Sequence, residues 1–165
     1  MRITRSFIQQ LCILAIIESL IAEFKKNEIE NTPELSGKIL YLKSQFIKIR
    51  SFLLSRHNVS INKDGYIVLD KKSEKRFNNT KDRMLKELAK ILPPKTIDLK
   101  LWINTSILIV DEFIKKLPEH IKTEWQDLLE ILCNIYEDFD NDISCQDMIK
   151  EGVNIGLKIL KTLES

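Results

Sequence analysis

An arginine and a histidine stand seven residues apart in a stretch whose apolar spacing is typical of a helix. Arg50 and His57 return almost to the same side of such a helix, because each residue advances by about 100°. Lys43 stands one further step of seven earlier. Histidine can accept and donate a proton near neutral pH, and arginine can stabilise charge on a phosphate. The spacing therefore favours a cationic stripe that includes one acid–base group.

An arginine followed a few residues later by a histidine resembles the RNase motif of the HEPN family. Those proteins are small and all-helical, occur in toxins and antiphage systems, and dimerise to pair two motifs. The resemblance implies that His57 is a general acid/base on a ribose 2′-hydroxyl, with Arg50 stabilising the phosphorane. It covers eight of 165 residues, and Ser51 stands where Asn, Asp or His is typical. A solvated pair at a helix end, with the histidine near the negative end of the dipole, explains the same residues without catalysis.

The other polar motifs predict neither a metal site nor a cofactor. Asp138, Asp140 and Asp142 resemble the start of a calcium loop, but a loop of that kind needs Gly at its sixth position and Glu at its twelfth. Ile143 and Ile149 stand there instead. No glycine-rich phosphate loop, nucleophile motif or Cys/His ligand spacing is present. We therefore expect an acidic loop between helices, and whether the chain is an enzyme stays open.

Charge is unevenly distributed along the chain although the net charge is only +2. Residues 38–95 hold 15 Lys/Arg against 5 Asp/Glu, whereas residues 119–147 hold one Lys against 9 acids. The two stretches could balance each other within the fold, bind a protein of opposite charge, or, on the basic side, bind nucleic acid. The candidate partner-binding residues are Lys43, Lys71, Lys72, Lys75, Arg76, Arg83, Lys86, Glu130 and Glu137.

Composition indicates a globular protein, with 44% hydrophobic and 30% charged residues. An abundance of Ile, Lys and Asn with little Ala suggests a low-GC genome such as that of a phage or virus. Three cysteines in apolar or helical stretches predict reduced, buried thiols and a cytoplasmic location. The N-terminal Arg residues and the apolar run 11–17 faintly resemble a signal sequence, but that run is short for a membrane span. We expect a buried first helix and no membrane association.

Apolar spacing predicts six helices separated by few breaks. The expected ranges are 3–29, a second helix that has Thr32 as N-cap and ends near His57, 72–92, 97–117, a fifth from Pro118 to about 139, and 143–163. In the second helix the apolar residues step by 4-3-4-3-4. The fourth is apolar on nearly all sides, so it belongs in the middle of a bundle. Gly152 and Gly156 favour a tight helix crossing.

Between the second and third helices the period changes to that of strands. Residues 59–61 and 66–69 are β-branched or aromatic, and their connection ends in Gly65. We therefore predict an all-α, single domain over residues 1–165: a five- to six-helix bundle with a small β-hairpin at about 59–69 inserted after the second helix.

Three functions are compatible with this pattern. The leading hypothesis is a non-enzymatic interaction or regulatory protein that binds another macromolecule, as an immunity protein, a phage or viral host-modulating factor, or an assembly subunit would. The alternatives are a HEPN-like RNase acting through Arg50 and His57, and a nucleic-acid-binding accessory subunit that uses the basic 38–95 surface. We expect a protein partner, with homodimerisation possible.

Overall fold

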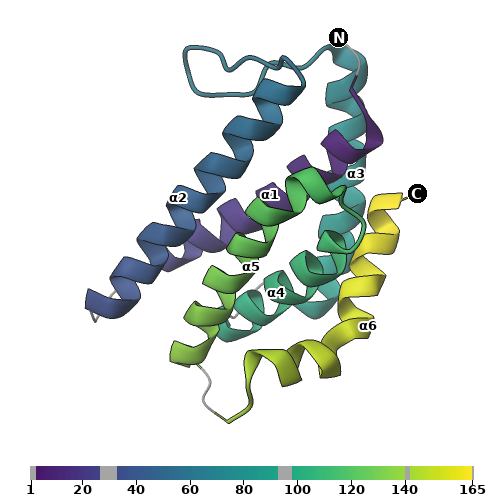
Figure 1. Cartoon of the computed structure of the whole chain (residues 1–165). Coiled ribbons are helices and arrows are strands. Elements are labelled where there is room, and N and C mark those ends of the chain that lie inside the picture. The colour runs from purple at the N-terminus through teal and green to yellow at the C-terminus, as the bar shows by residue number, and fades with distance from the viewer. Residues whose placement is uncertain (1–2, 27–32, 93–97, 140–141, 165) are drawn as a thin grey trace.

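Six α-helices form the structure, a computed structural model that describes residues 3–26, 33–92, 98–139 and 142–164 (Figure 1). They are α1 (Arg5–Lys26), α2 (Pro33–Arg56), α3 (Lys71–Ile91), α4 (Leu99–Ile114), α5 (Glu119–Phe139) and α6 (Cys145–Glu164). The predicted all-α helical bundle is confirmed. Thr32, the predicted N-cap of the second helix, lies outside the described residues, as do the residues after Lys26 that were expected to extend the first.

The apolar stripes of the sequence are the faces along which the helices pack. α4 packs against α1, α5 and α6, so it has neighbours on several sides, as its nearly continuous apolar surface requires. On α2 the buried residues are Leu54 and, at steps of 3-4-3-4, Ile39, Leu42, Phe46, Ile49 and Leu53; Leu35, which begins the predicted stripe, is half-buried. In the centre, Phe113 meets Trp125 edge-on with ring centroids 5.2 Å apart. This ring contact joins α4 to α5.

α1 is part of this core. Its buried residues include Phe7, Leu11, Leu14, Ile17 and Leu20. By length and composition alone this helix could cross a membrane, and 61% of its most apolar 18-residue window is buried inside the bundle. A core helix and a signal sequence both meet that criterion. In the fold described here α1 is a packed helix, against which α2, α3 and α4 lie.

The Gly152–Gly156 pair lies at the crossing of α6 over α4. A methyl group on Gly156 would come within 2.5 Å of the Leu108 backbone oxygen. One on Gly152 would come within 2.5 Å of the Leu108 side chain. The two glycines therefore let the helices approach more closely than any larger residue would allow. The predicted tight crossing is thus found between two helices of the same chain.

The predicted hairpin at 59–69 is wrong. The described residues contain no strand, and the segment joining α2 to α3 has only an isolated antiparallel bridge between Ile61 and Ile67. The side chain of Asn62 accepts bonds from the backbone N–H groups of Asp64 and Tyr66, at 3.0 and 2.9 Å. The Asn62 side chain thus holds the turn together. Pairing stops at one bridge because no neighbouring strand within the described residues supports it. We call residues 57–70 the connecting loop.

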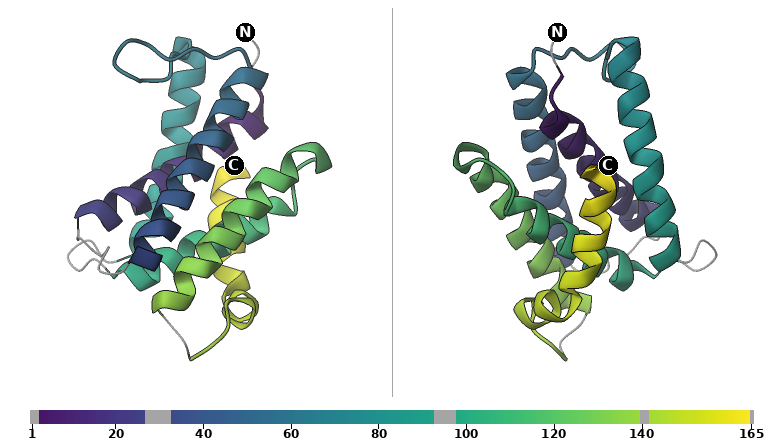
Figure 2. Two further views of the ribbon diagram at one scale, coloured as in Figure 1. Left: turned by 60° about the vertical axis from the view of Figure 1, so that its left-hand side comes forward. Right: turned by 90° about the vertical axis from the view of Figure 1, so that its right-hand side faces the viewer.

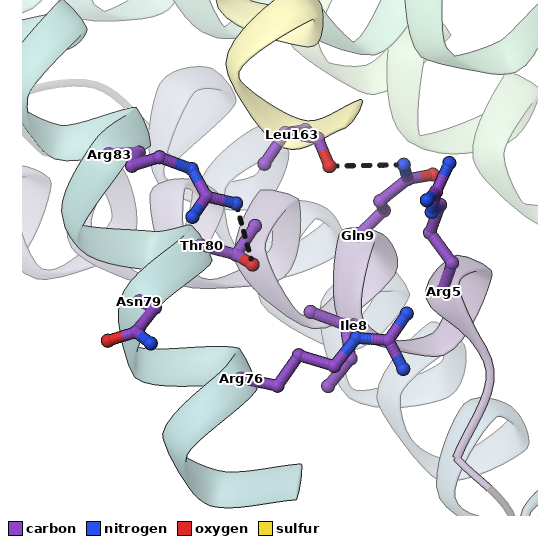
Figure 3. Close-up of a pocket in the computed structure, with 8 residues that line it drawn as sticks. All are labelled: Arg5, Ile8, Gln9, Arg76, Asn79, Thr80, Arg83 and Leu163. Atoms are coloured by element: carbon purple, nitrogen blue, oxygen red, sulfur yellow. Dashed lines mark hydrogen bonds between the residues drawn. The ribbon is translucent and has the colours of Figure 1, made fainter. Parts of the chain in front are cut away.

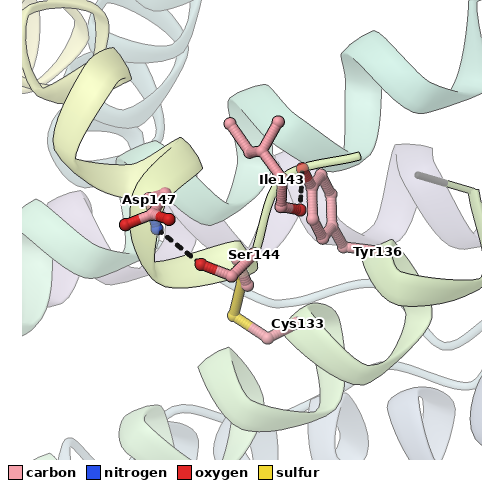
Figure 4. Close-up of a disulfide and its surroundings, with 6 residues drawn as sticks. Cys133, Tyr136, Ile143, Ser144 and Asp147 are labelled. Carbon is pink, nitrogen blue, oxygen red and sulfur yellow. Dashed lines mark hydrogen bonds between the residues drawn. A yellow bond between two sulfur atoms is a disulfide. The ribbon is translucent and has the colours of Figure 1, made fainter. Parts of the chain in front are cut away.

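The prediction of three reduced thiols is also wrong. Cys133 of α5 and Cys145, the first residue of α6, form a disulfide with their Cα atoms 5.7 Å apart (Figure 4). Beside it the Tyr136 hydroxyl donates to the Ile143 carbonyl oxygen at 3.1 Å. The Ser144 hydroxyl accepts from the Asp147 N–H at 3.1 Å, which caps α6. The remaining cysteine, Cys12, is free and buried.

Candidate functional site

A groove of about 890 Å³ has α1 as its floor. α2 and α3 both pack on α1 (Figure 2). Their side chains form the two walls, and the connecting loop closes one end. We call this hollow the α1–α3 groove. The floor includes Leu11, Leu14 and Ala15, and Phe46 of α2 and Met84 of α3 contribute to the walls.

Apolar side chains on the rim of the α1–α3 groove face solvent. Tyr66 is 71% exposed and Val68 45%, both from the connecting loop, and Leu85 of α3 is 47% exposed. Burial of such side chains by a ligand is favourable by about 25 cal/mol per Å² of apolar surface. Clustered exposed apolar groups around a groove mark an interaction surface, whereas isolated ones do not.

One flank of α2 extends the groove toward the end of α1. Leu40, Lys43, Ile47 and Arg50 follow one another at steps of three and four, so they share one side of the helix. Leu40 and Lys43 line a second hollow of about 230 Å³ beside Phe24. Leu40 is 64% and Ile47 59% exposed. The apolar surface thus continues along α2 beyond the α1–α3 groove.

Polar groups of both signs border the α1–α3 groove. Arg50 and Lys81 stand on one wall each, and Glu18 and Glu74 are exposed at its edges. The Lys81 ammonium lies 5.0 Å from the centre of the Phe77 ring, a cation–π distance. Charged groups of this kind can orient a ligand whose affinity comes from apolar contact.

Arg50 and His57 have separate neighbours. Arg50 is half-buried on α2, and its Nη2 donates to the Gly65 carbonyl oxygen of the connecting loop at 3.2 Å. His57 packs on the Phe7 ring, with ring centroids 4.7 Å apart. Burial, and secondarily the charge of Arg56, lower the pKa of His57.

The helix on which Arg50 and His57 were expected to align ends one residue before the histidine. α2 ends at Arg56, and Asn58 takes the left-handed conformation, with φ of 53°. The Val59 N–H then bonds to the Leu54 carbonyl oxygen at 2.9 Å, so the backbone reverses at this point. His57 is therefore the residue at which α2 gives way to the connecting loop, and Asn58, which follows it, turns the backbone away from the helix.

The basic candidates gather on α3. Lys71, Lys72, Lys75, Arg76 and Lys86 are exposed there, and Arg83 is half-buried. α3 packs against α1 and α6, whereas α5 packs against α2 and α4. The views of Figure 2 show α3 and α5 on different sides of the bundle. The basic face of α3 and the acidic face of α5 are consequently two separate surfaces.

The acidic candidates Glu130 and Glu137 are exposed on α5. Glu130 lines a hollow of about 370 Å³ that α5 shares with Lys38, Tyr41 and others of α2. Lys38 also pairs with Asp138 at 3.1 Å, which links the basic and acidic stretches of the sequence. Within the described residues, no group of three or more His, Cys, Asp or Glu side chains is placed to hold a metal ion.

Sequence reasoning missed the α1–α3 groove, because a groove depends on which helices become neighbours. The exposed loop residues Tyr66 and Val68 were the one available signal, since the predicted strands left apolar side chains without a partner.

Comparison of the chain with protein-family models, with curated proteins and with solved structures finds no match.

Proposed function

We propose that the chain is a non-enzymatic interaction protein that binds an amphipathic helix of a protein partner in the α1–α3 groove. The observation that carries this proposal is the groove itself: about 890 Å³, with an apolar floor and exposed Tyr66, Val68 and Leu85 on its rim. Grooves between helices are a common place for a partner's helix to lay its apolar face.

The shape of the surface favours a helix as the ligand. The flank of α2 runs from Leu40 to Arg50, ten steps along the helix, or roughly 15 Å at 1.5 Å per residue. That length matches about three turns of a bound helix, whose side chains at i, i+3 or i+4 and i+7 would contact the floor. Arg50 and Lys81 on the walls, with Glu18 and Glu74 at the edges, suit a ligand that carries charges of both signs beside its apolar face.

The RNase alternative has less support. Catalysis would need Arg50 and His57 to converge on one phosphate, yet Arg50 binds the connecting loop and His57 packs on Phe7. A lowered histidine pKa suits a general base, but burial against an aromatic ring explains it without catalysis. Replacement of His57 by Ala decides the matter, because any RNA cleavage by the purified chain must disappear with it.

Leu85 and Leu157 allow a matched test of groove binding. Both are leucines on a helix, and both are 47% exposed, but only Leu85 lies in the α1–α3 groove. A photo-crosslinking amino acid at position 85 identifies the partner in cells, and the purified partner is then titrated against variants. We expect Leu85→Glu to weaken binding at least about tenfold, since a carboxylate would replace apolar contact and would lose its hydration against the apolar face of the ligand.

Leu157→Glu is the control and should leave the affinity within about twofold of the original. Circular dichroism of both variants checks that the helices persist. Equal effects of the two substitutions, or crosslinks at position 157 to the same partner segment, would exclude the groove as the binding site. A partner segment that binds in an extended, non-helical form would also contradict the proposal.

A further inference from the structure

α3 carries a basic stripe on the flank that faces away from the α1–α3 groove. Lys72, Arg76, Asn79, Arg83, Lys86 and Lys90 follow one another at steps of 4-3-4-3-4, so they share one side of the helix. We call these six residues the α3 stripe. All are exposed except Arg83, which is half-buried. The residues of α3 that line the groove, including Asn78, Lys81 and Leu85, lie on the other flank.

A small pocket lies in the middle of the α3 stripe. It measures about 200 Å³ and is enclosed by the N-terminal turns of α1, the middle of α3 and the end of α6. Three arginines line it, one from α1 and two from α3, and none of its lining residues is acidic (Figure 3). The lining residues are Arg5, Ile8, Gln9, Arg76, Asn79, Thr80, Arg83 and Leu163.

Part of this pocket has a structural role. Arg83 donates to the Thr80 hydroxyl at 3.4 Å and to the Thr162 carbonyl oxygen at 3.5 Å. Gln9 donates to the Leu163 carbonyl oxygen at 3.3 Å. These donors meet the carbonyl groups that are left unpaired at the end of α6. Arg83 and Gln9 therefore anchor α6.

Arg5 and Arg76 supply the groups that can reach a ligand. Both are exposed, and the Arg76 Nη1 donates to the Ile3 carbonyl oxygen at 3.3 Å. Each guanidinium offers five N–H donors in a planar fork that fits two oxygens of a phosphate. Asn79, which stands between Arg76 and Arg83 along α3, adds an exposed amide. The pocket has the charge and the donors for one phosphate group.

The rest of the stripe favours a long polyanion over a single phosphate. From Lys72 to Lys90 it extends roughly 27 Å along the helix, at 1.5 Å per residue. A double-stranded nucleic acid presents a negative charge about every 1.7 Å of its axis. Glu87, the acid nearest its end, is paired with Lys90 at 3.0 Å and with Lys158 at 3.8 Å. Glu87 thus offsets part of the charge of Lys90, and Lys158 adds a cation beside this end of the stripe.

We propose that the α3 stripe binds the phosphate backbone of a double-stranded nucleic acid, with one phosphate seated between Arg5 and Arg76. None of the six stripe residues is aromatic, so bases have no side chain on which to stack. Binding is therefore independent of base sequence and favours duplex over single strands. This site is separate from the groove of the proposed function, because the two occupy opposite flanks of α3.

Fluorescence anisotropy with a labelled duplex of mixed sequence tests this inference. We expect affinity to fall at least tenfold between about 50 and 200 mM salt, as counterions are released by several phosphate contacts. The Arg5→Glu/Arg76→Glu double variant should lose at least about tenfold more at low salt, and its salt slope should fall by about 2, one for each arginine.

A matched double variant, Lys48→Glu/Lys150→Glu, changes the net charge equally at exposed positions on α2 and α6. It should retain affinity within about threefold, because long-range charge effects are screened in salt. Equal losses in the two double variants would overturn the inference, as would absent binding at low salt, tighter binding to single strands, or binding to anionic vesicles without binding to duplex. Leu85→Glu should leave duplex binding unchanged, which separates this site from the groove.

Discussion

At the scale of single residues, His57 connects the end of α2 to the core. Its ring packs on Phe7 just after α2 ends, and burial with the nearby Arg56 charge lowers its pKa. Protonation must then place a charge in a partly desolvated site beside a second cation. The side chain therefore behaves as a neutral packing group at neutral pH, whatever its resemblance to an RNase residue.

This lowered pKa makes stability depend on pH. Because the unfolded chain binds a proton at a higher pH than the folded chain, the contribution of His57 to the unfolding free energy is present above about pH 6.5. It is lost as the pH falls through the lower pKa of the folded state. In a His120→Asn background one histidine remains, and its NMR titration midpoint should lie below 6.5. A midpoint at or above that value would contradict the packing seen here.

The bonding state of the three cysteines can be tested by counting the thiols that react with an alkylating reagent. Burial raises the pKa of Cys12 to about 12, so its thiol does not react while the chain is folded. Cys133 and Cys145 are bonded to each other. Alkylation in denaturant should therefore modify one cysteine without reductant and three after reduction, as measured by mass spectrometry.

Reduction should also lower the free energy of unfolding. The bond closes a loop with a sequence separation of 12, for which loop entropy alone corresponds to about 3 kcal/mol. A Cys133→Ser/Cys145→Ser variant should show the same loss in urea denaturation, and should no longer respond to reductant. Three reactive thiols in the unreduced, denatured chain would show that the bond is absent.

At the scale of elements, the crossing of α4 and α6 depends on two glycines that are not equivalent. A methyl on Gly156 meets the backbone oxygen of Leu108, which cannot move without the helix, whereas one on Gly152 meets the Leu108 side chain, which can rotate. Gly37, in α2, has nothing within 4 Å of such a methyl. The three positions form a graded series for the same substitution.

Alanine replacements should reproduce that order. We expect Gly156→Ala to lower the free energy of unfolding by about 1–3 kcal/mol through overpacking. Gly152→Ala should lower it less. Gly37→Ala should raise it by about 0.5–1 kcal/mol, since alanine is the better helix former at an open site. Urea denaturation of the three variants measures this, and equal effects at 156 and 37 would disprove a close crossing.

The connecting loop shows how an element can be misjudged from its composition. Its β-branched and aromatic residues predicted strands, but Asn62 bonds the turn locally and the ladder stops at one bridge. Its apolar side chains remain partly exposed as a result. In the structure they form the closed end of the α1–α3 groove, so the strand signal came from apolar side chains that remain exposed there.

At the scale of the whole molecule, the charge separation seen in the sequence becomes a separation of surfaces. α3 and α5 lie on different sides of the bundle (Figure 2), and the Lys38–Asp138 pair links the basic and acidic stretches through α2. A protein partner in the groove and a duplex on the α3 stripe would occupy opposite flanks of α3. Both ligands can therefore be tested on the same molecule.

The number of helices, their apolar faces and the central place of α4 could be predicted from the sequence alone. Each depends on local physics, because helical hydrogen bonds join residues four apart and the apolar period marks the face to be buried. The spacing of Arg50 and His57 did not predict that Arg50 bonds to the connecting loop or that His57 packs on Phe7, because both neighbours come from other parts of the chain.

Only the tertiary structure decided which helices are neighbours. Three features join residues that no local pattern relates. They are the Cys133–Cys145 bond, the pocket between Arg5 and Arg76, and the α1–α3 groove. Their positions follow from how apolar faces from distant parts of the chain pack together, and from the close approach of α6 to α4 at Gly156. The candidate sites of this protein are products of that packing.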